Sequence, residues 1–400
     1  MKLLPFLAML AMPLAISSAY AEDGINMPTM TVSGFGTAAL TRSNSDDAEF
    51  IRPNQLKGVK TDAKTGVDSN FGIQATAKFN DWLSFTGQGL VRKNVKDDFV
   101  GEMAWAFAKA KVSENLSIRA GRVGLPVYMI SDYRNVGYAN TMIRPPVEMY
   151  TQVLLESVDG IDAVYQTSFG ETSVTAQLAL GRSEFESSAN YTAKFKDLVG
   201  INLVAENGPF TFRLGRVDTK VSVENSVSLN TVVGGLARFG YVSAANSLIV
   251  KDTKASFTSL GLGVDWKNIV VQAELGKRKS ESLAIQDTTS WYTMAGYRIG
   301  KFLPYVNHAS SKQDSPRTVA GLPTAGPLLV LAAGANAFAS QAPLQTSNSI
   351  GVRWDFYKSA ALKLQLDRIS PSNGNGTFIN AKPGFTGPVT VFAAGIDFVF

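Results

Sequence analysis

Apolar and polar residues alternate along most of the chain. In residues 71–79 the odd positions are Phe, Ile, Ala, Ala and Phe, and the even positions are Gly, Gln, Thr and Lys. A period of two is that of a β-strand with one apolar and one polar face. Similar stretches occupy residues 83–92, 172–181, 269–276, 291–299, 350–356 and 362–367. The chain is therefore predicted to be an all-β protein.

Sixteen strands are predicted. They cover residues 30–41, 69–79, 82–92, 102–112, 115–121, 158–169, 171–182, 196–205, 209–219, 257–266, 269–279, 288–299, 302–311, 346–357, 360–370 and 389–400. Residues 230–251 would raise the count to eighteen if they formed two strands. We prefer a long loop with a short helix there, because Val233, Leu236, Ala237, Gly240 and Tyr241 share one helical face.

The connections between these strands alternate between short and long. Two- or three-residue turns such as 80–81 and 267–268 are followed by long polar loops, near 42–68, 93–101, 122–157, 183–195, 280–287, 313–345 and 371–388. Strands of about ten residues, aromatic residues at strand ends and this alternation of connections are typical of a transmembrane barrel. A soluble sandwich would share only the period of two. We predict an antiparallel up-and-down barrel.

The first 21 residues have the pattern of a cleaved signal peptide. Lys2 precedes an apolar run from Leu3 to Ile16, and Ala19-Tyr20-Ala21 fits the small-residue rule for cleavage after Ala21. A membrane-anchoring helix is the alternative, but the run is short and two prolines interrupt it. We therefore expect residues 22–400 to form a single barrel domain. Since the strands begin soon after the signal, no large plug domain is expected.

Composition excludes several classes of function. Without Lys2 the chain has 37 basic and 33 acidic residues, a net charge of +4 that is too small to indicate nucleic-acid binding. With no cysteine and one histidine, His308, neither a zinc site nor a catalytic triad is expected. No Walker loop or GxSxG motif is present, and no mature stretch of 18 apolar residues predicts a membrane helix. We predict no enzyme activity, cofactor or metal.

The last strand carries a further signal. Ile396, Phe398 and Phe400 lie on one face, and a terminal Phe with apolar residues two and four places upstream resembles the signal read by the barrel-insertion machinery. With the signal peptide and the alternating strands, the chain resembles the Gram-negative porin superfamily over nearly its whole mature length. The resemblance implies an outer-membrane location, a homotrimer, contact with lipid and lipopolysaccharide, and a constriction formed by the loop after strand five, about 122–157.

In such a barrel the polar face of each strand lines the lumen. The candidate residues of the pore and constriction are Arg119, Arg122, Asp132, Arg134, Arg144, Glu148, Glu156, Asp162, Arg213, Arg298 and Arg353. Acids on the loop facing arginines on the wall would create a transverse field that orients passing solutes. Alternatively, these residues are solvated lumen charges or structural ion pairs.

Three kinds of function remain open at this level. The leading prediction is a channel for passive diffusion of small hydrophilic solutes and ions. The second is a channel selective for anions or small organic acids, because arginines and loop tyrosines would bind such solutes. A plugged structural or enzymatic barrel is the third. The segment Pro327 to Ala339 is predicted to be a helix or flap in an outer loop.

Overall fold

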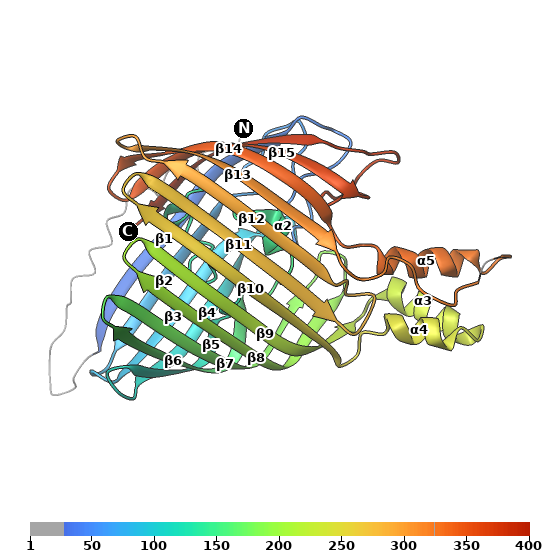
Figure 1. Ribbon diagram of the computed structural model, residues 1–400, viewed down its shortest axis with the longest axis horizontal. Helices are drawn as coiled ribbons and strands as arrows, with labels where there is room; N and C mark the ends of the chain where they lie inside the picture. The colour runs from blue at the N-terminus through green and yellow to red at the C-terminus, as the bar shows by residue number, and fades with distance from the viewer. Residues whose placement is uncertain (1–27, 324) are drawn as a thin grey trace.

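The computed structural model describes residues 28–323 and 325–400. The predicted signal peptide lies outside these residues. The chain forms one closed barrel of 16 antiparallel strands, in which each strand pairs with its neighbours in sequence and β1 pairs with β16 (Figure 1). The predicted class and count are confirmed, and the eighteen-strand alternative is wrong.

The strands are longer than predicted in several places. Their bounds are β1 Thr29–Ser43, β2 Asn70–Lys78, β3 Leu83–Lys93, β4 Phe99–Lys111, β5 Leu116–Gly124, β6 Ser157–Phe169, β7 Thr172–Glu186, β8 Thr192–Asn207, β9 Phe210–Glu224, β10 Thr253–Trp266, β11 Ile269–Ser280, β12 Thr288–Tyr297, β13 Phe302–Gln313, β14 Leu344–Tyr357, β15 Ala360–Asn373 and β16 Val389–Val399. Most of the additional residues lie toward the long loops. In β9, for example, Lys220 and Ser222 alternate with Val221 and Val223, so the period of two continues beyond the predicted end at residue 219.

The outer wall is apolar and the inner wall is polar. Large hydrophobic side chains such as Leu203, Leu260 and Ile350 are exposed on the outside. Aromatic residues such as Trp82, Trp266 and Tyr357 are exposed near the short turns, where one interfacial girdle of a membrane barrel is expected. An uncovered apolar band of this kind is stable in lipid rather than in water.

Short turns gather at one end of the barrel and long loops at the other, called here the turn end and the loop end (Figure 1). At the loop end, α3 (Val227–Arg238), α4 (Val242–Leu248) and α5 (Leu329–Ala339) pack together around buried Leu236, Leu248 and Ala335. The prediction of a helical loop at 230–251 is confirmed, but the loop holds two helices, and the chain turns at Gly240 within the predicted helical face. The predicted helix within 327–339 is confirmed as α5. No helix in the described part of the chain has the length and apolarity needed to cross a membrane.

Candidate functional site

The connection after β5 folds into the barrel. This lumen loop, residues 125–156, contains the short helices η2 (Gly137–Ala139) and α2 (Val147–Tyr150). η2 contacts β1 and β16, whereas α2 contacts β11 to β14, so the loop follows much of the inner circumference.

Glycines on the inner wall make room for the loop. A Cβ added to Gly215 would lie 2.7 Å from the carbonyl oxygen of Val127, and one added to Gly261 would lie 3.1 Å from the sulfur of Met129. The Ser259 hydroxyl donates to that same Val127 carbonyl at 2.6 Å. These glycines therefore permit close packing of the loop, instead of leaving open space.

The loop is bound to the wall through an apolar cluster. Tyr128 and Tyr150 stack with ring centroids 4.5 Å apart, and Tyr128 meets Phe257 of β10 edge to face at 5.3 Å. Met149 and Met294 of β12 are fully buried in the same cluster. Burial of this kind stabilises a loop conformation that local hydrogen bonds alone would not.

Cations of the wall bind carbonyl groups of the loop. The Lys363 ammonium donates to the carbonyls of Gly137 at 2.7 Å, Asn140 at 2.5 Å and Met142 at 3.1 Å, and it pairs with Asp397 at 2.7 Å. The carbonyls of an irregular buried loop have no strand partner, and an unpaired buried carbonyl is costly. The wall cations supply the missing donors.

Two of the predicted arginines have the same role. Arg213 donates to the Met129 carbonyl at 2.8 Å and pairs with Asp132 at 3.4 Å. Arg353 donates to the carbonyls of Tyr138 at 2.7 Å and Asn140 at 2.9 Å. These wall arginines anchor the loop.

Arg144 anchors the loop in the opposite direction, from the loop to the wall. Its guanidinium binds both carboxylate oxygens of Asp68, at 2.8 and 2.6 Å, and Asp367 of β15 at 2.5 Å. Its side chain is only 3% exposed, and the two carboxylates raise the pKa of Arg144 although burial opposes this. A buried, fully paired cation is expected to be structural.

Glu148 of α2 is buried, and among residues 28–323 and 325–400 no cation pairs with it. It accepts a hydrogen bond from the Gln345 amide at 2.8 Å, while its second oxygen has no hydrogen-bond partner within those residues. Burial raises the pKa of this carboxyl group. Glu148 is therefore an acid of the loop that does not face the polar cavity.

Two more of the predicted arginines form ion pairs on the inner wall. Arg119 of β5 binds Asp162 of β6 in a bidentate pair, with its Nε 2.8 Å from Oδ1, and Gln177 donates to Asp162 at 2.6 Å. Arg298, directly after β12, binds both oxygens of Asp265 near the turn end, at 2.5 and 2.7 Å. Both are wall ion pairs rather than opposed charges across a pore.

Arg122 points from the face of β5 opposite to that of Arg119, although it still borders the polar cavity described below. In the ladder it is opposite Ala106 and Asp159, whereas its neighbour Val123 is buried with the lumen loop. It forms a bidentate pair with Asp159 at 2.7 and 2.8 Å. Arg119 faces inward, so a residue three positions along the strand faces outward.

A polar cavity of about 360 Å³ remains beside the lumen loop, toward the loop end. The loop between β1 and β2 contributes Arg52, and β3 contributes Arg92. The lumen loop contributes Arg134 and Glu156. Glu156 pairs with Arg92 at 2.7 Å and with Arg134 at 3.2 Å. Among residues 28–323 and 325–400, no carboxylate lies within 4.0 Å of the Arg52 guanidinium. Burial lowers the pKa of Arg52 to about 10, so it remains charged at neutral pH.

Several residues of this arrangement were absent from the predicted site. They are Arg52, Asp68, Arg278, Lys363 and Asp397. Lys363 and Asp397 occupy polar positions of alternating strands, which shows that they face inward but not what they bind. Arg278 donates to the Gln152 carbonyl at 3.1 Å, a contact that depends on the path of the loop.

The C-terminal residues close the barrel. Phe400 exchanges two backbone hydrogen bonds with Gly34, at 2.9 and 3.0 Å, and its ring stacks near that of Phe71. Ile396 and Phe400 are exposed on the outer face. The single histidine, His308, shares a hydrogen bond of 2.8 Å with Asn348. No cluster of metal-ligating side chains exists within the described part of the chain.

Comparison with known proteins gives a structural match only. No family model and no curated protein matches the sequence. Among solved structures, OmpF of Salmonella typhi matches with a TM-score of 0.57 and 16% identity, covering 95% of this chain and 100% of that one. The anion-selective porin from Comamonas acidovorans has a TM-score of 0.52 and 13% identity, covering 93% and 99%. The outer membrane channel DcaP of Acinetobacter baumannii has a TM-score of 0.53 and 10% identity, covering 96% and 100%.

The chain has the fold of the outer-membrane porins. A closed barrel of 16 strands with one loop inside it matches these proteins over almost their whole lengths, which confirms the predicted resemblance at the level of fold.

Proposed function

We propose that this protein is a multi-pass porin of the Gram-negative outer membrane that admits small hydrophilic solutes and ions by passive diffusion. The observation that carries the proposal is the polar cavity beside a loop that is bound to the wall over most of its length. Because the loop is anchored by Arg144, Arg213, Arg353 and Lys363, the proposed path is permanently open rather than gated. The fold shared with porins and outer-membrane channels supports this proposal.

No catalytic role is proposed for any residue. His308 shares a hydrogen bond with the side-chain amide of Asn348, and Arg144, Arg213 and Arg353 anchor the lumen loop. The long loops would face the outside, where lipid and lipopolysaccharide surround the barrel. The barrel-insertion machinery would read Ile396, Phe398 and Phe400 during assembly.

A preference for anions or small organic acids is the second candidate. Arg52, Arg92 and Arg134 line the polar cavity together with acidic residues, and Glu156 and Glu102 pair with Arg92. Within the described part of the chain, no carboxylate lies within 4.0 Å of Arg52. An unpaired guanidinium beside a low-dielectric wall attracts anions and repels cations.

The decisive experiment measures single-channel conductance and reversal potential of the purified protein in planar bilayers under a salt gradient. Stable ohmic steps would support an open diffusion channel. The absence of any conductance from correctly folded protein would refute it and favour a plugged barrel.

The same measurement with Arg52→Glu tests the preference for anions. The reversal potential should shift toward cations, while the folded barrel and the open steps are retained. Lys301→Glu is the matched control, because it makes the same charge change in a turn at the other end of the barrel. Equal reversal potentials for Arg52→Glu and the wild type would leave general diffusion as the function.

A further inference from the structure

The wall of the barrel is incomplete where the lumen loop leaves it. β4 pairs with β5 only over residues 106–111, because β5 ends at Gly124. On the other side, β7 pairs with β6 only as far as Arg182. Residues 100–105 of β4 and 183–186 of β7 are therefore strand edges on either side of a gap above the ends of β5 and β6. We call this gap the wall window.

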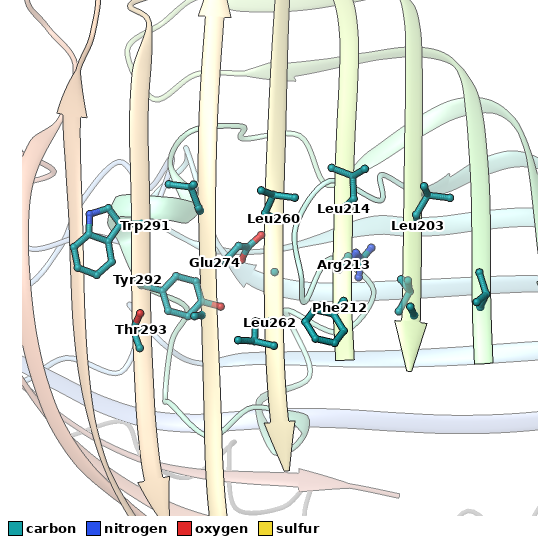
Figure 2. Close-up of a pocket in the computed structure, with 16 residues that line it drawn as sticks. Leu203, Phe212, Arg213, Leu214, Leu260, Leu262, Glu274, Trp291, Tyr292 and Thr293 are labelled. Carbon is teal, nitrogen blue, oxygen red and sulfur yellow. The ribbon is translucent and has the colours of Figure 1, made fainter. Parts of the chain in front are cut away.

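Elsewhere the wall is continuous. Over β8 to β10, for example, Leu203, Leu214 and Leu260 lie side by side on successive strands (Figure 2). At the usual distance of about 4.8 Å between strands, three spacings or about 14 Å separate the two edges of the wall window. A membrane barrel is normally closed so that no strand edge stays unpaired, and the window is an exception to this rule.

Side chains bind the free edges in place of the missing strands. Arg122 donates to the Met103 carbonyl of β4 at 3.3 Å. Asn54, in the loop between β1 and β2, donates to the Glu186 carbonyl of β7 at 2.8 Å and accepts a hydrogen bond from the Ser188 amide at 3.0 Å. The edges are thus satisfied, although the space between them is not filled by a strand.

The polar cavity of about 360 Å³ extends through the wall window. Its lining includes Met103 and Asp159 on the outer face of the wall, and Arg92 and Arg134 on the inner side. Met103 is 53% exposed, and the side chains of Arg122 and Asp159 are 42% and 43% exposed. Because residues of both faces line one cavity, the lumen communicates here with the outside of the wall.

A segment of the first loop forms the upper edge of the window. Residues 52–55 line the cavity, and Asn54 holds them to β7. At the other end of the segment, the Leu56 amide donates to the carbonyl of Asn94, directly after β3, at 3.2 Å. The segment therefore crosses from β3 to β7 and separates the window from the open loop end.

The window begins at the edge of the apolar band. Ile161 of β6 and Leu180 of β7 are opposite each other on the outer face, and they are 50% and 40% exposed. The next outward pair toward the loop end is Asp159 with Arg182. The outer wall thus changes from apolar to charged at the lower edge of the window.

We infer that the wall window is a second, lateral entrance to the polar cavity, for organic anions that carry an apolar body. An amphipathic group buries its apolar part and keeps its charge in water, so such anions collect at the level of the window. Met103 and Ala104 offer contacts to the apolar part, and Arg122 is the first of a series of guanidinium groups that continues inward with Arg92 and Arg134. The inference rests on the proposed channel and adds a route that does not pass the loop end.

Reversal potentials of the full-length protein in planar bilayers test the entrance, with benzenesulfonate and chloride as probes. Sulfonates stay charged and so do not cross the lipid as neutral acids. Ala104→Trp places an indole ring in the window and should lower the permeability ratio of benzenesulfonate to chloride about fivefold. Ala163→Trp, on the outer face of β6 below the window, should leave the ratio unchanged. A wild-type ratio in Ala104→Trp would show that the window is sealed in the assembled protein and would overturn the inference.

A change of charge should act in the opposite direction. Asp159→Asn keeps the shape of the side chain and releases Arg122, so the ratio of benzenesulfonate to chloride should rise about threefold. Asp162→Asn is the matched control, because it releases Arg119 from a bidentate pair on the inner wall and should affect the two anions alike. An unchanged ratio in Asp159→Asn, or an equal rise in both variants, would refute the role of Arg122.

Chloride conductance separates this inference from the proposed channel. Ala104→Trp leaves the loop end open, so chloride steps should persist when the lateral entrance is blocked. A wild type that conducts chloride but whose ratio does not respond to Ala104→Trp would refute the lateral entrance alone, whereas a wild type without chloride conductance would refute both.

Discussion

At the scale of single residues, the acids of the lumen loop have opposite environments. Glu156 is paired with two arginines, whereas Glu148 is buried against an amide. A buried carboxyl group without a cation favours the protonated form, and this is why burial raises its pKa. The two acids should therefore respond oppositely to replacement by glutamine.

Glu148→Gln is expected to stabilise the protein at neutral pH by about 1 kcal/mol, because it removes the cost of a buried, unpaired charge. The pKa of Glu148 is higher in the folded state than in the unfolded state. Its contribution to stability is therefore present at acidic pH and lost as pH rises above the unfolded value. Thermal unfolding midpoints of variant and wild type should converge as pH falls toward about 4, the ordinary range of glutamate.

Glu156→Gln is the control for that measurement. It leaves Arg92 and Arg134 without their shared carboxylate, and so the unfolding midpoint should fall rather than rise. A rise in both variants, or no change in Glu148→Gln across the pH range, would contradict the environment assigned to Glu148.

At the scale of elements, the lumen loop depends on donors supplied by distant strands. Lys363 on β15 binds three loop carbonyls and Asp397 of β16, and its side chain is fully buried. Removing one member of such a group leaves an uncompensated charge and several unpaired carbonyls.

Lys363→Met should therefore destabilise the protein by about 3–5 kcal/mol, the usual cost of breaking a buried pair from one side. It should also release the segment around η2, which would appear as added noise in single-channel current. The double variant Lys363→Met/Asp397→Asn should recover part of the stability, but its single-channel current should remain as noisy as that of Lys363→Met. An unchanged current in both variants would show that η2 does not need this anchor.

The closing strand gives a prediction about assembly. Replacing Phe400 with serine removes the terminal ring and its stacking on Phe71 but keeps the backbone bonds to Gly34. The rate of insertion into membranes containing the insertion machinery should fall severalfold, and the unfolding midpoint of the protein that does insert should change little. Val399→Ala is the matched control, and an equal loss in both variants would argue against recognition of Phe400.

At the scale of the whole molecule, the proposed homotrimer is the prediction to test. The outer face of β2 to β4 is lined by small residues, among them Ala75, Gly87, Ala106 and Ala108, which permit close approach of a second barrel.

Purified protein should therefore migrate as a trimer on native gels and insert as conductance steps in groups of three. Ala106→Trp, which projects from that small-residue face, should yield monomers with single steps. Ala163→Trp, farther round the outer face, should remain trimeric. Trimers in both variants would place the interface elsewhere on the wall.

The architecture of the barrel could be predicted from the amino-acid sequence alone. Alternation of apolar and polar residues depends only on the pleat of a strand, so it revealed the barrel, its strand count and the direction of most side chains. The spacing of apolar residues near 230–251 likewise indicated a helical loop. Both signals are local, because they depend only on residues that are close together in the sequence.

The partners of the inward-facing charges became clear only from the three-dimensional arrangement of the strands and the lumen loop. Arg122 and Arg119 are three residues apart, yet the ladder places them on opposite faces of the wall. Arg144 meets Asp68 and Asp367 because an irregular loop crosses the barrel, and no period in the sequence encodes that path. The anchoring of the loop and the polar cavity beside it depend on residues far apart in the chain, which the folding of the loop into the barrel brings together.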